Sequence, residues 1–293
     1  MRNETKGTLA ILGSSLGYGG LAVLGKIALD RGVGVVPLLA WRFLLAAALL
    51  WTLVWITHTP LPKAQRIRGI VVLGVIYSVN SLVFMLGLAR IPAGLASLVF
   101  FTYPTVVVLV SRFWGGERLT GRRVLSLLLA TAGCSLIVIQ GIATVDVIGI
   151  LWVLAAVVLI AWFIVTSHEV MADVPAISST AILLTTTAVI LTTAGLVGDG
   201  LSVPTDTSTI GVLVALGVTA TAIPVTLFLL GVQWVGPARA SIFSTLEPLI
   251  TVGLAAVILG ERLLPLQLGG GALILAGVIW LRLEPSTVED HPH

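Results

Sequence analysis

Glu247 is the side chain in this sequence with the greatest capacity for chemistry. It lies near the middle of an apolar stretch, residues 237–259, where an ionisable group inside a membrane costs several kcal/mol unless it is satisfied. Pro248 has no backbone N–H, so it leaves the carbonyl of Ser244 without its helical partner. A neutral Glu247 could donate its proton to that carbonyl and stabilise a kink. Alternatively, the carboxylate could exchange protons or bind the amine of a small ligand.

Two cations in apolar stretches, Lys26 and Arg42, are candidates for a gating or structural charge. Lys26 lies within a helical turn of the end of its stretch and can extend its ammonium group to the membrane surface. Arg42 lies too deep for that. It either bridges helices through backbone carbonyls and a carboxylate such as Asp30, or lines an outer vestibule and binds an anionic group there. We favour the bridge.

Uncharged polar side chains gather at similar depth in other apolar stretches. An amide such as that of Asn80 offers two donors and an acceptor. Any one of these groups could instead form an interhelical hydrogen bond. Together they predict a polar cavity, and the residues expected to contact a substrate are Tyr18, Tyr77, Asn80, Tyr103, Trp162, Thr221, Ser244 and Glu247.

Long apolar segments must position these residues. Of the 293 residues, 57% are hydrophobic and only 10% are charged, whereas soluble domains contain about 25% charged residues. A membrane-spanning helix needs about 20 predominantly apolar residues. The sequence therefore predicts an all-α polytopic membrane protein with ten transmembrane helices, near residues 7–29, 35–57, 69–89, 92–112, 121–140, 146–167, 177–198, 208–231, 237–259 and 265–284.

The chain also contains an internal repeat. Residues 88–138 match residues 232–282 at an offset of 144: Ala96-Ser97 corresponds to Ala240-Ser241, Pro104 to Pro248, and the motif Gly-Glu-Arg-Leu at 116–119 to that at 260–263. Each half of the chain contains five predicted spans, an odd number, so the second half must enter the membrane from the opposite side. We therefore expect two inverted five-helix repeats, residues 1–144 and 145–284, followed by a disordered cytoplasmic tail, residues 285–293. Inverted repeats are typical of transporters with a site at the membrane midplane.

Three features carry a resemblance to a known family: the proline-containing spans that end in Gly-Glu-Arg-Leu, the stretch Trp-Arg-Phe-Leu-Leu-Ala-Ala at 41–47, and the stretch Gly-Lys-Ile-Ala-Leu at 25–29. In these features the sequence resembles the drug/metabolite transporter superfamily. The resemblance is to its ten-helix members with two tandem EamA-type domains, and it covers essentially the whole chain. It implies cytoplasmic termini, a central cavity lined by both halves, and export of small molecules. One departure is that Tyr103 in the first repeat stands where the second has Glu247, so the halves cannot contribute equivalent charges.

The distribution of basic residues predicts the orientation. Most of the 16 Lys and Arg residues fall at the termini and in the even-numbered loops, and such loops face the cytoplasm. We therefore expect a protein of the plasma (inner) membrane with both termini cytoplasmic, Glu117 inside and Glu261 outside. The net charge of +3 is explained by this topology and does not indicate a nucleic-acid partner.

The sequence favours a secondary transporter over an enzyme. It has no His pair at metal-binding spacing and a single cysteine, Cys134, so no metal, cofactor or catalytic group is expected. One acidic centre with hydroxyls and aromatic rings suits small amphipathic metabolites such as amino acids or drugs, carried by alternating access around a midplane cavity. The alternative is a channel-like or non-transporting membrane scaffold protein. Expected partners are a small-molecule substrate and membrane lipid, and we expect a monomer rather than a homodimer.

Overall fold

The computed structural model of the protein describes residues 2–115, 121, 125, 128–129, 132–133, 136, 146–198, 200–201, 205–244, 246–261 and 265–282, and these contain helices but no strand. Most of the predicted fifth span and the whole predicted tail, 285–293, lie outside these residues. Within the described residues, six helices are long and apolar enough to cross a membrane: Thr5–Asp30, Val35–Thr57, Ala64–Leu88, Val147–Val170, Ala176–Val197 and Thr207–Val235. Two shorter apolar helices there are Ala93–Val107 and Leu268–Gly277.

The helices follow one another along the chain with short connections. The half before residue 145 contains α1 (Arg2–Gly19), α2 (Leu21–Asp30), α3 (Val35–Thr57), α4 (Ala64–Leu88), α5 (Ala93–Phe100) and α6 (Tyr103–Gly115). The half after it contains α8 (Val147–Val170), α9 (Ala176–Val197), α10 (Thr207–Gly217), η1 (Val218–Ala222), α11 (Ile223–Val235), α12 (Pro237–Phe243), α13 (Leu246–Ile258) and α14 (Pro265–Arg282).

Four apolar stretches are interrupted helices. The interruptions separate α1 from α2, α5 from α6 and α12 from α13, and one turn of π-helix, η1, separates α10 from α11. A proline, with no N–H and a fixed φ, is tolerated at the start of a helix but not in its interior. This explains why new helices begin at these interruptions, with a proline within the first three residues of α6, α11 and α13: Pro104, Pro224 and Pro248.

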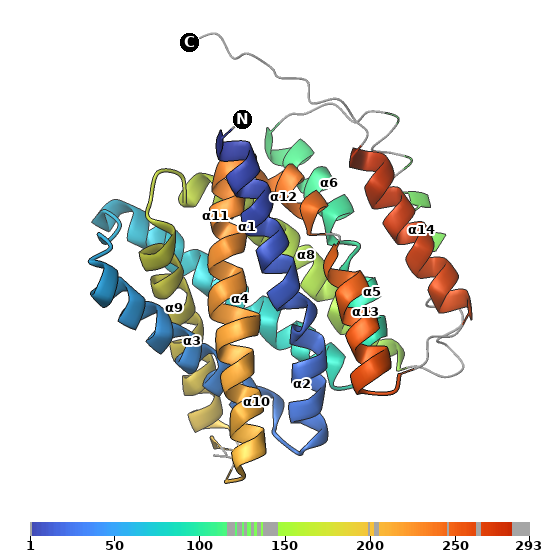
Figure 1. The fold of residues 1–293 in the computed structure, drawn as a ribbon, viewed down its shortest axis with the longest axis horizontal. Helices are drawn as coiled ribbons and strands as arrows, with labels where there is room; N and C mark the ends of the chain where they lie inside the picture. Colours follow the sequence, from blue (N-terminus) through green and yellow to red (C-terminus); the bar gives the residue numbers. More distant parts are fainter. Residues whose placement is uncertain are drawn as a thin grey trace.

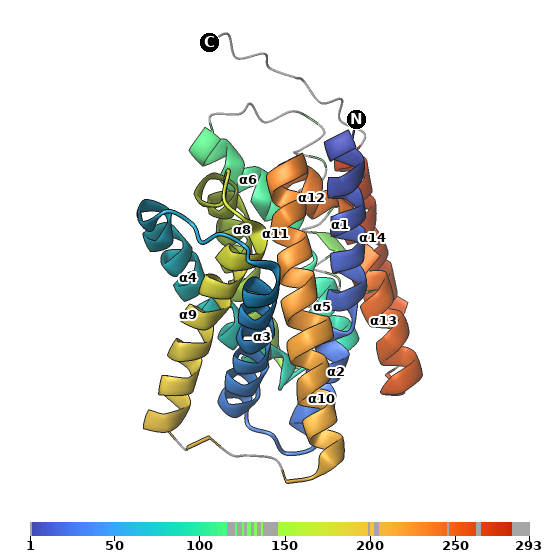
Figure 2. The ribbon, with the colours of Figure 1, turned by 60° about the vertical axis from the view of Figure 1, so that its left-hand side comes forward.

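The two halves pack closely against each other. The most extensive contacts place α3 along α9, α4 along α8, and α1 along α11, and the first and last of these pairs are visible in both Figure 1 and Figure 2. Small residues allow this approach, as expected in membranes. A Cβ added to Gly17 would lie 2.5 Å from the Thr219 carbonyl oxygen, and one added to Gly87 would lie 2.6 Å from Val153.

The start of α1 and the end of α14 lie at the same end of the helical bundle (Figures 1 and 2). We call this the terminal end. The opposite end contains the C-terminus of α2, the start of α10 and the end of α13 (Figure 1). The central cavity described next is formed by residues at intermediate positions along these helices.

Candidate functional site

A cavity of about 80 Å³ lies among helices of both halves. We call it the central cavity. The first half contributes α1 to α6 and the second half contributes α8, α11 and α13. The lining residues are Tyr18, Leu21, Ala22, Arg42, Tyr77, Asn80, Ser81, Phe84, Ser97, Phe100, Tyr103, Ile160, Phe163, Ile164, Phe228, Glu247 and Thr251. Five of the residues predicted to contact a substrate are therefore brought together here: Tyr18, Tyr77, Asn80, Tyr103 and Glu247.

Glu247 reaches the central cavity because the chain breaks just before it. α12 ends at Phe243 and α13 begins at Leu246, so Glu247 lies in the first turn of a new helix. The Ser244 carbonyl accepts the backbone N–H of Glu247 at 3.0 Å, and the kink does not need the side chain to satisfy it. Among the described residues, nothing donates a hydrogen bond to the Glu247 carboxyl group, which leaves it available to the cavity.

Arg42 on α3 is almost fully buried, at 2% exposed. Its Nε donates to the Thr221 hydroxyl at 2.6 Å, and its guanidinium carbon lies 4.7 Å from the centre of the Phe43 ring. It lines the central cavity together with Tyr77. The predicted bridge between helices is therefore present. The predicted partners of Arg42 in this bridge are wrong. The Thr221 hydroxyl takes the place of backbone carbonyls, and the carboxylate of Asp30 lies 3.9 Å from Lys26 instead.

The π-helical turn explains how Thr221 meets Arg42. A π-turn adds one residue per turn and shifts the side chains that follow it. The Thr221 hydroxyl donates to the Leu216 carbonyl five residues back at 2.7 Å, and it accepts from Arg42 with its remaining lone pairs. Thr221 is fully buried but does not line the central cavity. The sequence predicted that Thr221 contacts a substrate. In the structure, its hydroxyl instead accepts a hydrogen bond from Arg42.

Asn80 on α4 presents an unsatisfied acceptor. It is 5% exposed and lines the central cavity, and its Oδ1 has no hydrogen-bond partner within the described part of the chain. Leaving a buried polar group unpaired costs roughly 1–3 kcal/mol. The group is therefore suited to accept a hydrogen bond from something that enters the cavity.

Three other predicted residues lie away from the cavity surface. Trp162 is 37% exposed on the outer side of α8, whereas the next residue, Phe163, lines the cavity. Ser244 is buried, and its hydroxyl donates to the Ala240 carbonyl at 3.0 Å. Lys26 lies near the end of α2 and donates to the Leu88 carbonyl at 3.4 Å.

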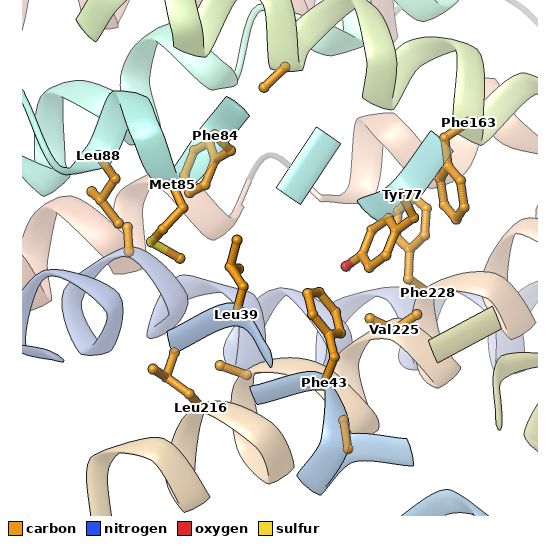
Figure 3. Packing of buried hydrophobic residues seen from close by; sticks show 14 of the residues in the cluster. Leu39, Phe43, Tyr77, Phe84, Met85, Leu88, Phe163, Leu216, Val225 and Phe228 are labelled. Carbon is orange, nitrogen blue, oxygen red and sulfur yellow. The ribbon is translucent and has the colours of Figure 1, made fainter. Parts of the chain in front are cut away.

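Aromatic rings form much of the cavity wall. Tyr77 and Phe163 lie with ring centres 5.1 Å apart, and Phe84 and Phe100 with ring centres 5.0 Å apart. Figure 3 shows Tyr77 beside Phe163. Sequence reasoning missed these phenylalanines because phenylalanine is ordinary in any apolar helix. The available signal was that Ile160, Phe163 and Ile164 share one helical face, at spacings of three and four residues.

At the end opposite the termini, polar groups join the two halves. The Glu261 carboxylate accepts the N–H groups of Ala93 and Gly94 at 2.8 and 2.9 Å, and so caps α5. Arg90 pairs with Asp146 at 2.7 Å. Arg90 and the backbone N–H groups of α8 hold the pKa of Asp146 below its usual range, so this pair stays charged at neutral pH. The corresponding Glu117 lies outside the described residues.

A third link lies at the same end. Arg31 after α2 donates to the hydroxyl of Ser208 at 3.0 Å. Ser208 and Thr209 are held in turn by Asp206, which caps α10 and accepts the Thr209 N–H at 2.7 Å. Hydrogen bonds from Thr209, with a smaller effect of Arg31, lower the pKa of Asp206 to about 2. The end of the bundle opposite the termini is thus fastened by charges and helix caps that cross from one half to the other.

Comparison with known proteins agrees with this architecture. The EamA-like transporter family matches residues 5–139 and again residues 147–283. The uncharacterized transporter YcbK of Bacillus subtilis is 24% identical, over 99% of this chain and 97% of its own length. An uncharacterized transporter of Archaeoglobus fulgidus is 44% identical over 66 residues, which are 22% of this chain and 24% of that protein.

A solved crystal structure has the same fold, with a TM-score of 0.73 at 23% identity, over 94% of this chain and 97% of the other. This likeness concerns the fold alone. The family match extends over both halves and includes the residues around the central cavity. The chain is an integral membrane protein of the EamA-like transporter family.

Proposed function

We propose that this protein is a secondary transporter of small amphipathic metabolites, such as amino acids or drugs, that works by alternating access around the central cavity. The observation that carries the proposal is that helices of both halves line one cavity containing Glu247, Arg42 and the unsatisfied Asn80. Polar groups inside a membrane are costly and commonly mark a substrate or ion path. Broken helices beside the cavity support the same function, since transporters of this kind bind substrates where helices are interrupted.

The helix pairing supports ten helices in two inverted five-helix repeats, residues 1–144 and 145–284. Under an exchange of the repeats, the pair α1–α11 corresponds to the pair α8–α4, and these are two of the three most extensive contacts. The pair α3–α9 combines a helix with its own counterpart, and the pair α5–α13 corresponds to the pair α12–α6, which is also in contact. This is the pattern expected if a twofold axis relates the halves.

Polar links between the halves at one end of the bundle support alternating access. Arg90–Asp146, Glu261 with the start of α5, and Arg31–Ser208 all join the halves at the end opposite the termini. With cytoplasmic termini in the plasma (inner) membrane, as the basic loops favour, this would be the outer end. Opening it would require these few polar links to break. We favour outward transport as the direction, and a monomer as the transporting unit.

Solute counterflow in proteoliposomes tests the proposal. Vesicles containing purified protein are loaded with an unlabelled solute, and uptake of the same labelled solute is followed without any ion gradient. A transporter gives a transient accumulation that saturates with concentration, because the loaded cavity must return across the membrane. Equilibration without accumulation would indicate a channel-like protein. No solute movement above protein-free vesicles, over a panel of amino acids, nucleosides and amphipathic cations, would favour a scaffold.

A further inference from the structure

The links between the halves at the end opposite the termini can be compared with what the repeat offers at the terminal end. The Glu261 carboxylate accepts the N–H groups of Ala93 and Gly94, the first two residues of α5. Arg90, just before α5, forms an ion pair with Asp146 at the start of α8. In a protein of inverted repeats, an exchange of the two conformations would require the counterparts of these links to form at the terminal end.

The counterpart of Ala93 is a proline. α5 begins at Ala93, and α12 begins 144 residues later at Pro237, which is the offset of the repeat. The same offset relates Glu261 to Glu117. Because proline has no backbone N–H, Pro237 cannot donate to a carboxylate as Ala93 donates to Glu261 at 2.8 Å. Of the two N–H groups in the cap of α5, a cap of α12 would thus retain only that of Ala238.

The counterpart of Arg90 is a tryptophan. Trp234 lies 144 residues after Arg90, at the end of α11. An indole carries no charge and donates a single hydrogen bond. The ion pair that Arg90 forms with Asp146 at 2.7 Å therefore cannot be repeated through Trp234.

The third link between the halves does not distinguish the two ends. Arg31, after α2, donates to Ser208 at the start of α10. Arg66, near the start of α4, donates to the Glu169 carbonyl near the end of α8 at 3.2 Å. These two links correspond to each other under the exchange of repeats, and both are present in the same structure. The difference between the ends thus lies in the cap of α5 and the ion pair of Arg90.

We propose that the unloaded protein prefers to close the end opposite the termini, so that the central cavity is reached from the terminal end. Pro237 sets most of this preference, and Trp234 contributes to it. The inference rests on the proposed alternating access and adds the side on which the protein waits. A conformation closed at the terminal end would lose the double cap by Glu261 and the ion pair of Arg90, and it could not form their equals in exchange. The waiting protein is therefore ready to load from the side of the termini.

Thiol accessibility in membrane vesicles measures this preference. Ser81, which lines the central cavity, is replaced by cysteine in a Cys134→Ser background, and a small impermeant thiosulfonate is added on one side at a time. A protease-cleavable tag on the C-terminus identifies the side that carries the termini. We expect the thiol to react at least tenfold faster from that side, because a hydrogen bond to a charged group favours the closure of the other end by about that factor.

Exchanges of proline test the assigned cause. Ala93→Pro removes from the cap of α5 the N–H that α12 lacks, and a proline is tolerated as the first residue of a helix. Pro237→Ala gives α12 the missing N–H. Each should raise the reaction rate from the side opposite the termini about tenfold. Arg90→Gln should act in the same direction by a smaller factor, because an exposed ion pair is weak. Ala176→Pro is the matched control, since Ala176 also begins a helix, α9, directly after a proline, and it should leave both rates unchanged.

The inference is overturned if the native protein reacts equally fast or faster from the side opposite the termini, or from neither side. It is also overturned if Ala93→Pro and Pro237→Ala change the rates no more than Ala176→Pro does. If Ala93→Pro does not fold, Pro237→Ala decides. A failure of the transport proposal gives a different result: counterflow is absent, while the faster reaction from the side of the termini and its response to the prolines remain. Counterflow together with faster reaction from the opposite side would support transport and overturn the preference.

Discussion

Replacing Thr221 by valine should destabilise the protein because it removes the acceptor that holds Arg42. The side chains are nearly equal in volume, so the change deletes two hydrogen bonds without leaving a cavity: Arg42 to Thr221 at 2.6 Å and Thr221 to Leu216 at 2.7 Å. Hydrogen bonds between neutral groups in membrane proteins contribute about 0.6 kcal/mol on average. A bond to a charged group contributes about 1.5–3 kcal/mol. We therefore expect a loss of about 2–4 kcal/mol in the free energy of unfolding.

Thr219 on the same π-turn provides a matched control. Its hydroxyl also donates within the helix, to the Ala215 carbonyl at 2.8 Å, whereas the hydrogen bond of Arg42 goes to Thr221. Thr219→Val should lose only about 0.6 kcal/mol. Reversible unfolding in mixed micelles, followed by tryptophan fluorescence, measures both variants. In an Arg42→Met background, Thr221→Val should cost no more than Thr219→Val. Equal losses for the two threonines in the native background would refute the assigned role of Thr221.

Other perturbations separate packing, capping and binding. Glu261→Ala removes the cap of α5 and should lower stability by about 0.5–2 kcal/mol in the same unfolding assay; unchanged stability would contradict the cap. Asn80→Leu should leave stability unchanged or raise it, because it removes an unsatisfied acceptor, but it should weaken amino-acid binding; normal binding would show that the group does not meet the ligand. Gly87→Leu should abolish folded, monodisperse protein on size-exclusion chromatography, because even a Cβ would lie 2.9 Å from the Gly149 carbonyl oxygen. Cysteines at 117 and 261, placed singly in a Cys134→Ser background, should react with impermeant reagents from opposite sides of the membrane; reaction from one side would exclude inverted repeats.

The helices and their breaks were largely predictable because the membrane imposes simple rules. Apolar length predicts a span, and a proline inside one predicts an interruption, as at Pro104 and Pro248. Residues at mid-depth with polar groups must face protein or a cavity. For this reason Tyr18, Tyr77, Asn80, Tyr103 and Glu247 could be assigned to one cavity from their depth and chemistry.

Which side of a helix faces the central cavity was less predictable. Trp162 and Phe163 are adjacent, and only packing decides that the second faces inward. The apolar pattern of α8 gives little direction, since apolar residues surround this helix. The phenylalanines of the cavity wall were missed for the same reason.

Partners that are distant in sequence could not be read from local patterns. Asp30 is close to Arg42 in sequence, but Arg42 meets Thr221 because α3 packs against η1. The Gly-Glu-Arg-Leu motif predicted a helix end and a turn, while the role of Glu261 is to cap a helix of the other half. Such a contact depends on how the halves fit together, which neither repeat encodes alone.

The claim that the end of the bundle opposite the termini must open for transport can be tested most directly by cross-linking the two halves there. Arg90→Cys and Asp146→Cys replace the ion pair at 2.7 Å in a Cys134→Ser background, and a short bifunctional thiosulfonate joins the two thiols. Counterflow is measured before cross-linking, after it, and after reduction, with each single-cysteine variant as a control. The account predicts that cross-linking stops counterflow in the double variant only and that reduction restores it. Full counterflow in the cross-linked protein would contradict alternating access through this end.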